Sequence, residues 1–94
     1  MEKRARTLLA QKLRLLRFIK NWSQEQLAQI SGLDRSYVSS IERAERNVSL
    51  DNIEKLADAF NITPDELLRN HNTGDIDHIL TSKLTLSGSK KDIN

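Results

Sequence analysis

The sequence lacks cysteine altogether and contains no long apolar run. The absence of cysteine excludes both a disulfide framework and a metal site built from thiolates, and it is consistent with a reducing cytoplasm. A helix that crosses a bilayer needs roughly 18 to 20 consecutive apolar residues, and no segment approaches that length, so we expect no membrane association. The basic segment MEKRARTLLAQKLRLL has neither the continuous apolar region nor the small-residue cleavage site of a signal peptide. We therefore expect a mature cytoplasmic protein.

The sequence also lacks the residue patterns that catalysis requires. No serine has a histidine nearby to act as its base, and no glycine-rich loop is present to bind phosphate. The carboxylates fall at expected helix caps and on solvent-facing positions. His71 and His78, with two aspartates between them, form only a weak pattern for metal. We therefore expect no enzyme activity, no metal and no cofactor.

Charge of both signs is present but is unevenly distributed along the chain. The net charge of +2 does not by itself indicate a nucleic-acid partner. The first 22 residues, however, contain seven Lys or Arg and one acid, whereas residues 23–70 contain five basic and nine acidic residues. A phosphate backbone would approach the first of these surfaces and avoid the second.

Apolar residues at three- and four-residue spacing predict helices in the first 70 residues. The first helix is expected over residues 7–20, with an apolar stripe made of Leu8, Leu9, Leu13, Leu15, Leu16, Phe18 and Ile19. Four more are expected over residues 24–31, 35–43, 50–60 and 64–70. The pattern predicts an all-α fold, a compact five-helix bundle, because no strand pattern occurs before residue 71.

The chain divides into two parts by composition. Residues 1–70 are expected to form the folded domain, and residues 71–94 a polar C-terminal tail that is partly ordered or mobile. Within the tail, Ile76, Ile79 and Leu80 fit one or two helical turns, whereas residues 83–87 alternate like a strand. The pattern does not choose between these two.

Local signals mark the ends of the helices. Asn21 tolerates the left-handed conformation that often ends a helix, and Ser23 is an N-cap with Gln26 as its capping-box partner. Gly32 ends the second helix, and Asp34 is a suitable N-cap for the third. Further N-caps are expected for the last two helices, at Ser49 and at Thr63, the latter with Glu66 closing a capping box.

The two helices that meet at Gly32 differ in what they offer for burial. The earlier one presents Leu27, Ala28 and Ile30, whereas the later one presents only Val38 and Ile41. A helix that buries one thin edge, and carries small or polar residues elsewhere, suits insertion into the major groove of B-DNA, which is roughly 12 Å wide. The glycine turn between the two helices predicts a helix-turn-helix.

The run SQEQLAQISGLDRSYVSSIERAERNVSLDNIEKLADAF resembles the phage-repressor-like helix-turn-helix family (Cro/C1-type, XRE), from about Leu9 to Leu68. The Ser-Gln-Glu-x-Leu-Ala opening, the Gly-Leu turn and the Ser-x-Ile-Glu helix end carry the resemblance together. The part GLDRSYVSSIERAERN is also similar to the controller proteins of restriction–modification systems. The chain departs from the family at Ala44, where glycine is common, and at Val48, where proline is common. These departures concern the loop after the third helix.

The resemblance implies roles for particular residues. Arg35, Ser36 and Ser40 occupy positions that face base edges, and Arg17 and Glu42 match an ion pair between the first and third helices. Gln24 would contact a phosphate and steady a neighbouring side chain. The expected DNA-binding residues are Gln24, Arg35, Ser36, Tyr37, Ser39, Ser40, Arg43, Arg46 and Asn47. Trp22 is expected to pack at the corner between the first two helices.

The expected partner is double-stranded DNA, bound by a homodimer at a pseudo-palindromic operator, since one such domain reads only a few base pairs. The dimer interface is expected at the end of the fourth and fifth helices, among Ile62, Leu67, Leu68, Ile76 and Ile79. The resemblance implies that the bound dimer blocks or recruits RNA polymerase. An antitoxin-like module, whose tail binds a partner protein, is the alternative function, and a degenerate scaffold without DNA binding is a third.

Overall fold

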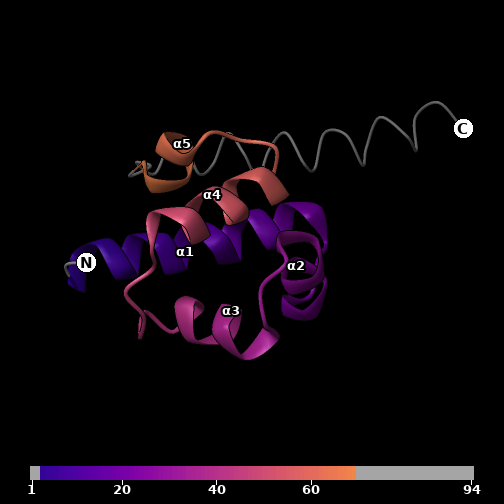
Figure 1. Ribbon diagram of the computed structural model, residues 1–94, viewed down its shortest axis with the longest axis horizontal. Coiled ribbons are helices and arrows are strands. Elements are labelled where there is room, and N and C mark those ends of the chain that lie inside the picture. The colour runs from indigo at the N-terminus through magenta and orange to yellow at the C-terminus, as the bar shows by residue number, and fades with distance from the viewer. Residues whose placement is uncertain (1–2, 70–94) are drawn as a thin grey trace, which may run out of the picture.

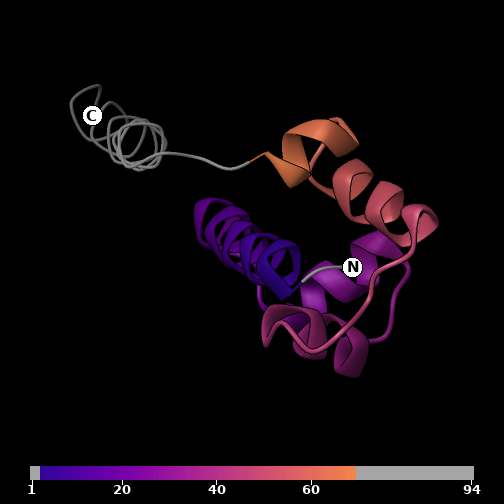
Figure 2. The ribbon, with the colours of Figure 1, turned by 90° about the vertical axis from the view of Figure 1, so that its left-hand side faces the viewer.

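The computed structural model describes residues 3–69, and within that range every regular element is an α-helix (Figures 1 and 2). The helices are α1 (Lys3–Lys20), α2 (Gln24–Ser31), α3 (Arg35–Glu42), α4 (Leu50–Ala59) and α5 (Pro64–Leu68). The all-α, five-helix expectation is confirmed, although α1 begins four residues earlier than expected. None of these helices has the length and apolar character needed to cross a bilayer.

The expected tail, residues 71–94, lies outside the described residues, as does Asn70. The helical and strand-like patterns expected there, the two histidines, and the antitoxin-like interaction therefore concern segments on which the structure gives no information. The division of the chain into a domain and a tail stays a prediction.

The core lies among the five helices, where α1 packs against α3 and α5, α2 packs against α3 and α4, and α4 packs against α5. Most of it is made of the expected stripes. Leu9 and Leu13 of α1 are fully buried, and Leu16 packs against the same cluster. Phe18 was expected to broaden this stripe, and that expectation is wrong because more than half of its surface is exposed. Phe18 lies about two and a half helical turns from Leu9, which places it on the opposite face of α1.

The second helix shows a similar difference. Leu27 and Ala28 are buried as expected, but Ile30 is 51% exposed. Ser31 is buried in its place, so the inward face of α2 runs from Leu27 to Ser31 and Ile30 falls beside it. Trp22, at the corner before α2, stacks on Phe60 with ring centroids 5.2 Å apart and an interplanar angle of 25°, which confirms its expected packing role.

Most of the expected helix ends are confirmed. Asn21 and Gly32 adopt left-handed conformations with φ of 58° and 77°. Ser23 and Gln26 form both bonds of a capping box. Asp34 stands at the N-cap of α3, but its side chain makes no capping hydrogen bond. Ser49 caps α4 through the Asn52 N–H.

The capping box expected at the start of α5 does not form. Thr63 stands at the N-cap position, but its side chain makes no capping bond to the backbone. Its hydroxyl donates instead to the Glu66 carboxylate at 3.0 Å. A side chain of α1 also stabilises the short helix α5. Lys12 is only 7% exposed, and its Nζ donates to the Glu66 carbonyl oxygen at 3.0 Å.

Candidate nucleic-acid interface

Helix α3 is attached to the domain along one narrow edge. Val38 and Ile41 are buried as expected, while Arg35 and Ser36 at the start of the helix are exposed. Figures 1 and 2 place α3 and α5 on opposite sides of the molecule, so α3 forms one outer surface of the domain. The exposed face of α3 is therefore free to enter a groove.

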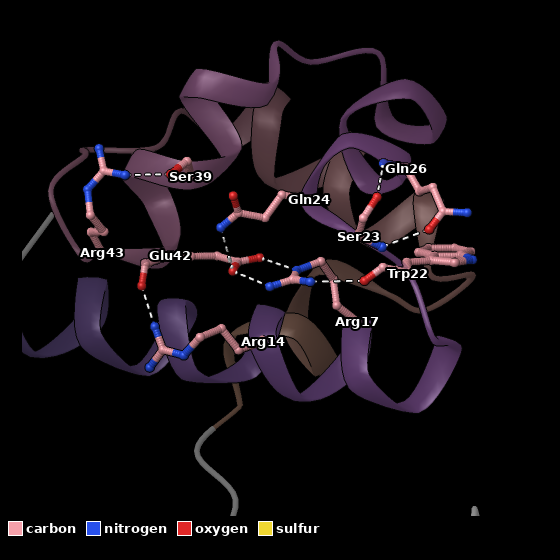
Figure 3. A network of polar contacts seen from close by, with 9 residues as sticks. All are labelled: Arg14, Arg17, Trp22, Ser23, Gln24, Gln26, Ser39, Glu42 and Arg43. Atoms are coloured by element: carbon pink, nitrogen blue, oxygen red, sulfur yellow. Dashed lines mark hydrogen bonds and ion pairs between the residues drawn. The ribbon is translucent and has the colours of Figure 1, made fainter.

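The C-terminal end of α3 is fixed to α1 by a buried ion pair (Figure 3). Glu42 is 4% exposed, and its two carboxylate oxygens accept from Arg17, with Nε at 2.6 Å and Nη2 at 2.7 Å. The third nitrogen, Nη1, donates to the Trp22 carbonyl oxygen at 2.9 Å. This arrangement confirms the expected pair between α1 and α3, and its bidentate geometry sets the direction in which α3 projects.

The same pair fixes the charge state of Arg17. The hydrogen bonds that Arg17 donates to the Glu42 carboxylate raise the pKa of the Arg17 guanidinium, and the attraction of the Glu42 charge adds to this, while burial acts in the opposite direction. The Glu42 carboxylate therefore favours the protonated form of Arg17, the form that holds the end of α3 against α1.

Two further side chains converge on Glu42. Gln24 Nε2 donates to Glu42 Oε1 at 3.2 Å, so Gln24 is tied to the end of α3, and its expected phosphate contact stays a prediction. Arg14 of α1 donates to the Glu42 backbone carbonyl, as Figure 3 shows. Arg14 was not among the residues predicted from the sequence, although its position one helical turn before Arg17 could have indicated it.

The structure contradicts the expectation that Ser40 faces base edges. The residue is 5% exposed, and its Oγ donates to the Tyr37 carbonyl oxygen at 2.7 Å and accepts from Arg46 Nε at 3.0 Å. The cause is the segment after α3, which folds back so that Arg46 covers this side of the helix. Ser40 is therefore an inner residue of the candidate interface.

Tyr37 and Arg46 lie together over that buried serine. The Arg46 guanidinium carbon is 5.6 Å from the centroid of the Tyr37 ring, within the range of a cation–π interaction. The Tyr37 hydroxyl accepts from Asn52 Nδ2 of α4 at 3.1 Å. Tyr37 therefore links the end of the candidate interface to α4, a role that the sequence did not indicate.

The remaining expected residues line the outer side of α3 and the segment after it. Arg43 donates through Nη1 to Ser39 Oγ and through Nε to Glu45 at 3.1 Å. Asn47 and Arg46 are exposed, and Ser39 is partly exposed. The exposed side of α3 and this segment thus brings together three arginines with short polar side chains, the set needed for phosphate and base-edge contacts.

Comparison with known proteins places these features in a family. A family model described as helix-turn-helix matches residues 11–67. A hypothetical transcription factor of Neisseria meningitidis is 49% identical over 67 residues, which span 71% of this chain. They span 63% of the Neisseria protein, so this chain matches less than two thirds of that relative's length.

Two further similar proteins have the word control or controller in their names. Control protein C.BamHI of Bacillus amyloliquefaciens is 51% identical over 69 residues, which span 72% of this chain and 85% of that protein. The crystal structure of the restriction–modification controller protein C.AhdI of Aeromonas hydrophila superposes with a TM-score of 0.64 and 58% identity, over 66% of this chain and 94% of that one.

Proposed function

Because this chain belongs to the helix-turn-helix family, we propose that it works as a homodimer that binds a pseudo-palindromic DNA operator. It is a DNA-binding transcriptional regulator. The observation that carries the proposal is the attachment of α3, which is buried along one edge, fixed at its end by Arg17 and Glu42, and polar on its outer side.

In the proposed complex, α3 lies in the major groove. Arg35, exposed in the first turn, contacts a guanine through two hydrogen bonds, the commonest specific contact. Ser36 and Ser39 approach neighbouring base edges, which their short side chains permit. The remaining contacts go to backbone phosphates and are made by Gln24, Tyr37, Arg43, Arg46 and Asn47.

The proposed dimer uses the side of the molecule opposite α3. Leu68 of α5 is 42% exposed, and Ile62 is partly exposed and packs at the edge of the core. Leu67 was also expected at the interface, but it is fully buried in its own domain and is not available. Ile76 and Ile79 lie outside the described residues. A dimer of this kind spans two half-sites about 34 Å apart.

The similar control and controller proteins support a narrower role, that of a controller of a restriction–modification system. In that role the dimer regulates its own gene and an endonuclease gene, and occupancy of the operator blocks or recruits RNA polymerase. It acts as activator at low dose and as repressor at high dose.

Selection of bound sequences from a random duplex pool tests the operator, and light scattering on the recovered complex gives the number of chains. We expect a symmetric pair of half-sites with two chains bound. Absence of enrichment, together with a monomer in solution, would refute both the operator and the dimer.

Substitution of two arginines tests the orientation of α3 on the selected operator. Arg35→Ala is expected to cost about 1–3 kcal/mol per site and to relax preference at one base position. Arg43→Ala is expected to weaken all sequences alike and to lower the slope of log affinity against log salt by about one. Exchanged outcomes would show that α3 lies in the groove in another orientation.

A further inference from the structure

Two contacts hold the guanidinium group of Arg46: a hydrogen bond at its Nε and the aromatic ring of Tyr37. Its Nε donates to the buried Ser40 Oγ at 3.0 Å, and its guanidinium lies 5.6 Å from the centroid of the Tyr37 ring. Within residues 3–69 these are its only hydrogen bond and its only ring contact, so both terminal Nη groups remain without a protein acceptor there. Arg46 is nevertheless exposed.

The backbone after α3 is shaped so as to bring Arg46 to this place. Ala44 adopts a left-handed conformation with φ of 61°, and the Glu45 N–H donates to the Ser40 carbonyl oxygen at 3.0 Å. The chain therefore turns back toward α3 directly before Arg46. Tyr37, on which the guanidinium rests, is itself held by Asn52.

The chemistry of the Ser40 hydroxyl gives its contact with Arg46 a fixed direction. A hydroxyl has one proton, and that of Ser40 is donated to the Tyr37 carbonyl oxygen at 2.7 Å. The lone pairs of the Ser40 oxygen therefore point away from the Tyr37 carbonyl, and one of them accepts the hydrogen bond from Arg46 Nε. Since Ser40 is 5% exposed, water competes poorly for this bond.

We infer that Ser40 is a positioning residue which, with Tyr37, orients the Arg46 guanidinium before DNA arrives, so that its two Nη groups form a fork ready for one backbone phosphate. The inference rests on the proposed function, because it concerns the same interface. A guanidinium fork matches the geometry of a phosphate. Ordering a long side chain on binding costs affinity, and orientation in the free protein avoids about two- to tenfold of that loss.

The first test uses the free protein and needs no DNA. Nitrogen-15 relaxation of the arginine Nε–H groups reports how rigid each guanidinium is on the picosecond-to-nanosecond scale. We expect Arg46 Nε in the unmodified chain to have an order parameter of about 0.8, falling to about 0.6 or below in Ser40→Ala. Equal mobility in the two proteins would overturn the inference.

Ser31→Ala is the matched control for that substitution. Ser31 is 7% exposed in α2, and its Oγ donates to the carbonyl oxygen three residues earlier, that of Ala28, at 3.3 Å. It thus has the burial and the hydrogen bond of Ser40 but no arginine. We expect Ser31→Ala to leave the order parameter of Arg46 unchanged, which separates loss of positioning from general loosening of a helix.

The second test measures affinity for the most enriched duplex from the selection, as a double-mutant cycle. Ser40→Ala is expected to weaken binding about two- to tenfold with base preference and salt slope unchanged. Arg46→Ala is expected to weaken it further and to lower the salt slope by about one. In the Arg46→Ala background, Ser40→Ala is expected to have no further effect.

The outcomes separate this inference from the proposed function. If Ser40→Ala weakens binding equally in both backgrounds, or alters preference at one base position, Ser40 contacts DNA itself and the inference fails while the function stands. If the unmodified chain binds no duplex, the proposed function fails and with it the phosphate contact. The relaxation comparison then still decides whether Ser40 orients Arg46.

Discussion

Replacing Glu42 with alanine removes the acceptor for two nitrogens of Arg17 and leaves that guanidinium without a counterion. The Glu42 side chain is 3% exposed and that of Arg17 is 20% exposed. Loss of one partner from a buried pair costs about 3–5 kcal/mol. The exposed part of Arg17 can recover some hydration, while the lost hydrogen bond from Gln24 adds roughly 1 kcal/mol, so we expect a net loss of about 3–4 kcal/mol in the free energy of unfolding.

Such a loss is large for a domain whose total stability is roughly 5–10 kcal/mol. Urea unfolding followed by circular dichroism measures it. With a slope of about 1 kcal/mol per M, the midpoint should fall by about 3–4 M. Glu42→Gln, which keeps the shape and can still accept a hydrogen bond but carries no charge, should lie between the two proteins.

Glu45→Ala, in the segment directly after α3, provides the matched control. Glu45 also accepts from an arginine Nε, that of Arg43 at 3.1 Å, but the two side chains are 55% and 56% exposed. Pairs of that kind contribute about 0–1 kcal/mol, so the midpoint should hardly move. If Glu42→Ala and Glu45→Ala shifted the midpoint by the same amount, burial would not be what makes the Arg17–Glu42 pair important.

Three further predictions follow from other features. Leu68→Glu should convert the proposed dimer to a monomer in light scattering, whereas Ile30→Glu, at a similarly exposed apolar position, should leave the mass unchanged. A dimeric Leu68→Glu variant would place the interface elsewhere. Ala44→Gly should stabilise the fold by about 0.5–1 kcal/mol in urea unfolding, because glycine accepts the left-handed conformation without strain; destabilisation would refute that strain. The Thr63 hydroxyl has one proton, which it shares between the Glu66 and Asp65 carboxylates, and its hydrogen bond to Asp65 lowers the pKa of Asp65. This interaction therefore stabilises the folded state above the ordinary carboxyl pKa and is lost as pH falls through the lowered value. Thr63→Val should raise the Asp65 pKa toward its ordinary value in a carbon-13 NMR titration, and an unchanged titration would contradict this cause.

Much of the fold was predictable because it is determined locally. Asn21, Ser23 and Gly32 end or begin helices through their own backbone and side-chain preferences, which act within a few residues. The stripe through Leu9 and Leu13 follows from helical period alone. The pairing of Arg17 with Glu42 was available only from the family resemblance, since no local pattern connects α1 with α3.

The wrong predictions concern side chains whose surroundings come from elsewhere in the chain. Ser40 lies one residue from Ser39 and has the same chemistry, yet it is buried because the segment containing Arg46 folds over it. A sequence pattern cannot indicate that a later segment returns to cover a given position. Leu67 and Leu68 show the same limit, because only packing against α1 and α4 decides which of two adjacent leucines is enclosed.

The few attachment points of α3 have an evolutionary consequence. Val38, Ile41 and Glu42 hold the helix in the domain, while Arg35 and Ser36 contribute nothing to that attachment. Mutations at the latter two positions are therefore nearly neutral for folding, and if α3 binds DNA as proposed, selection can act on them through DNA-sequence preference alone. Duplicated copies of such a regulator can diverge to separate operators by drift at these positions, without first acquiring compensating changes in the core.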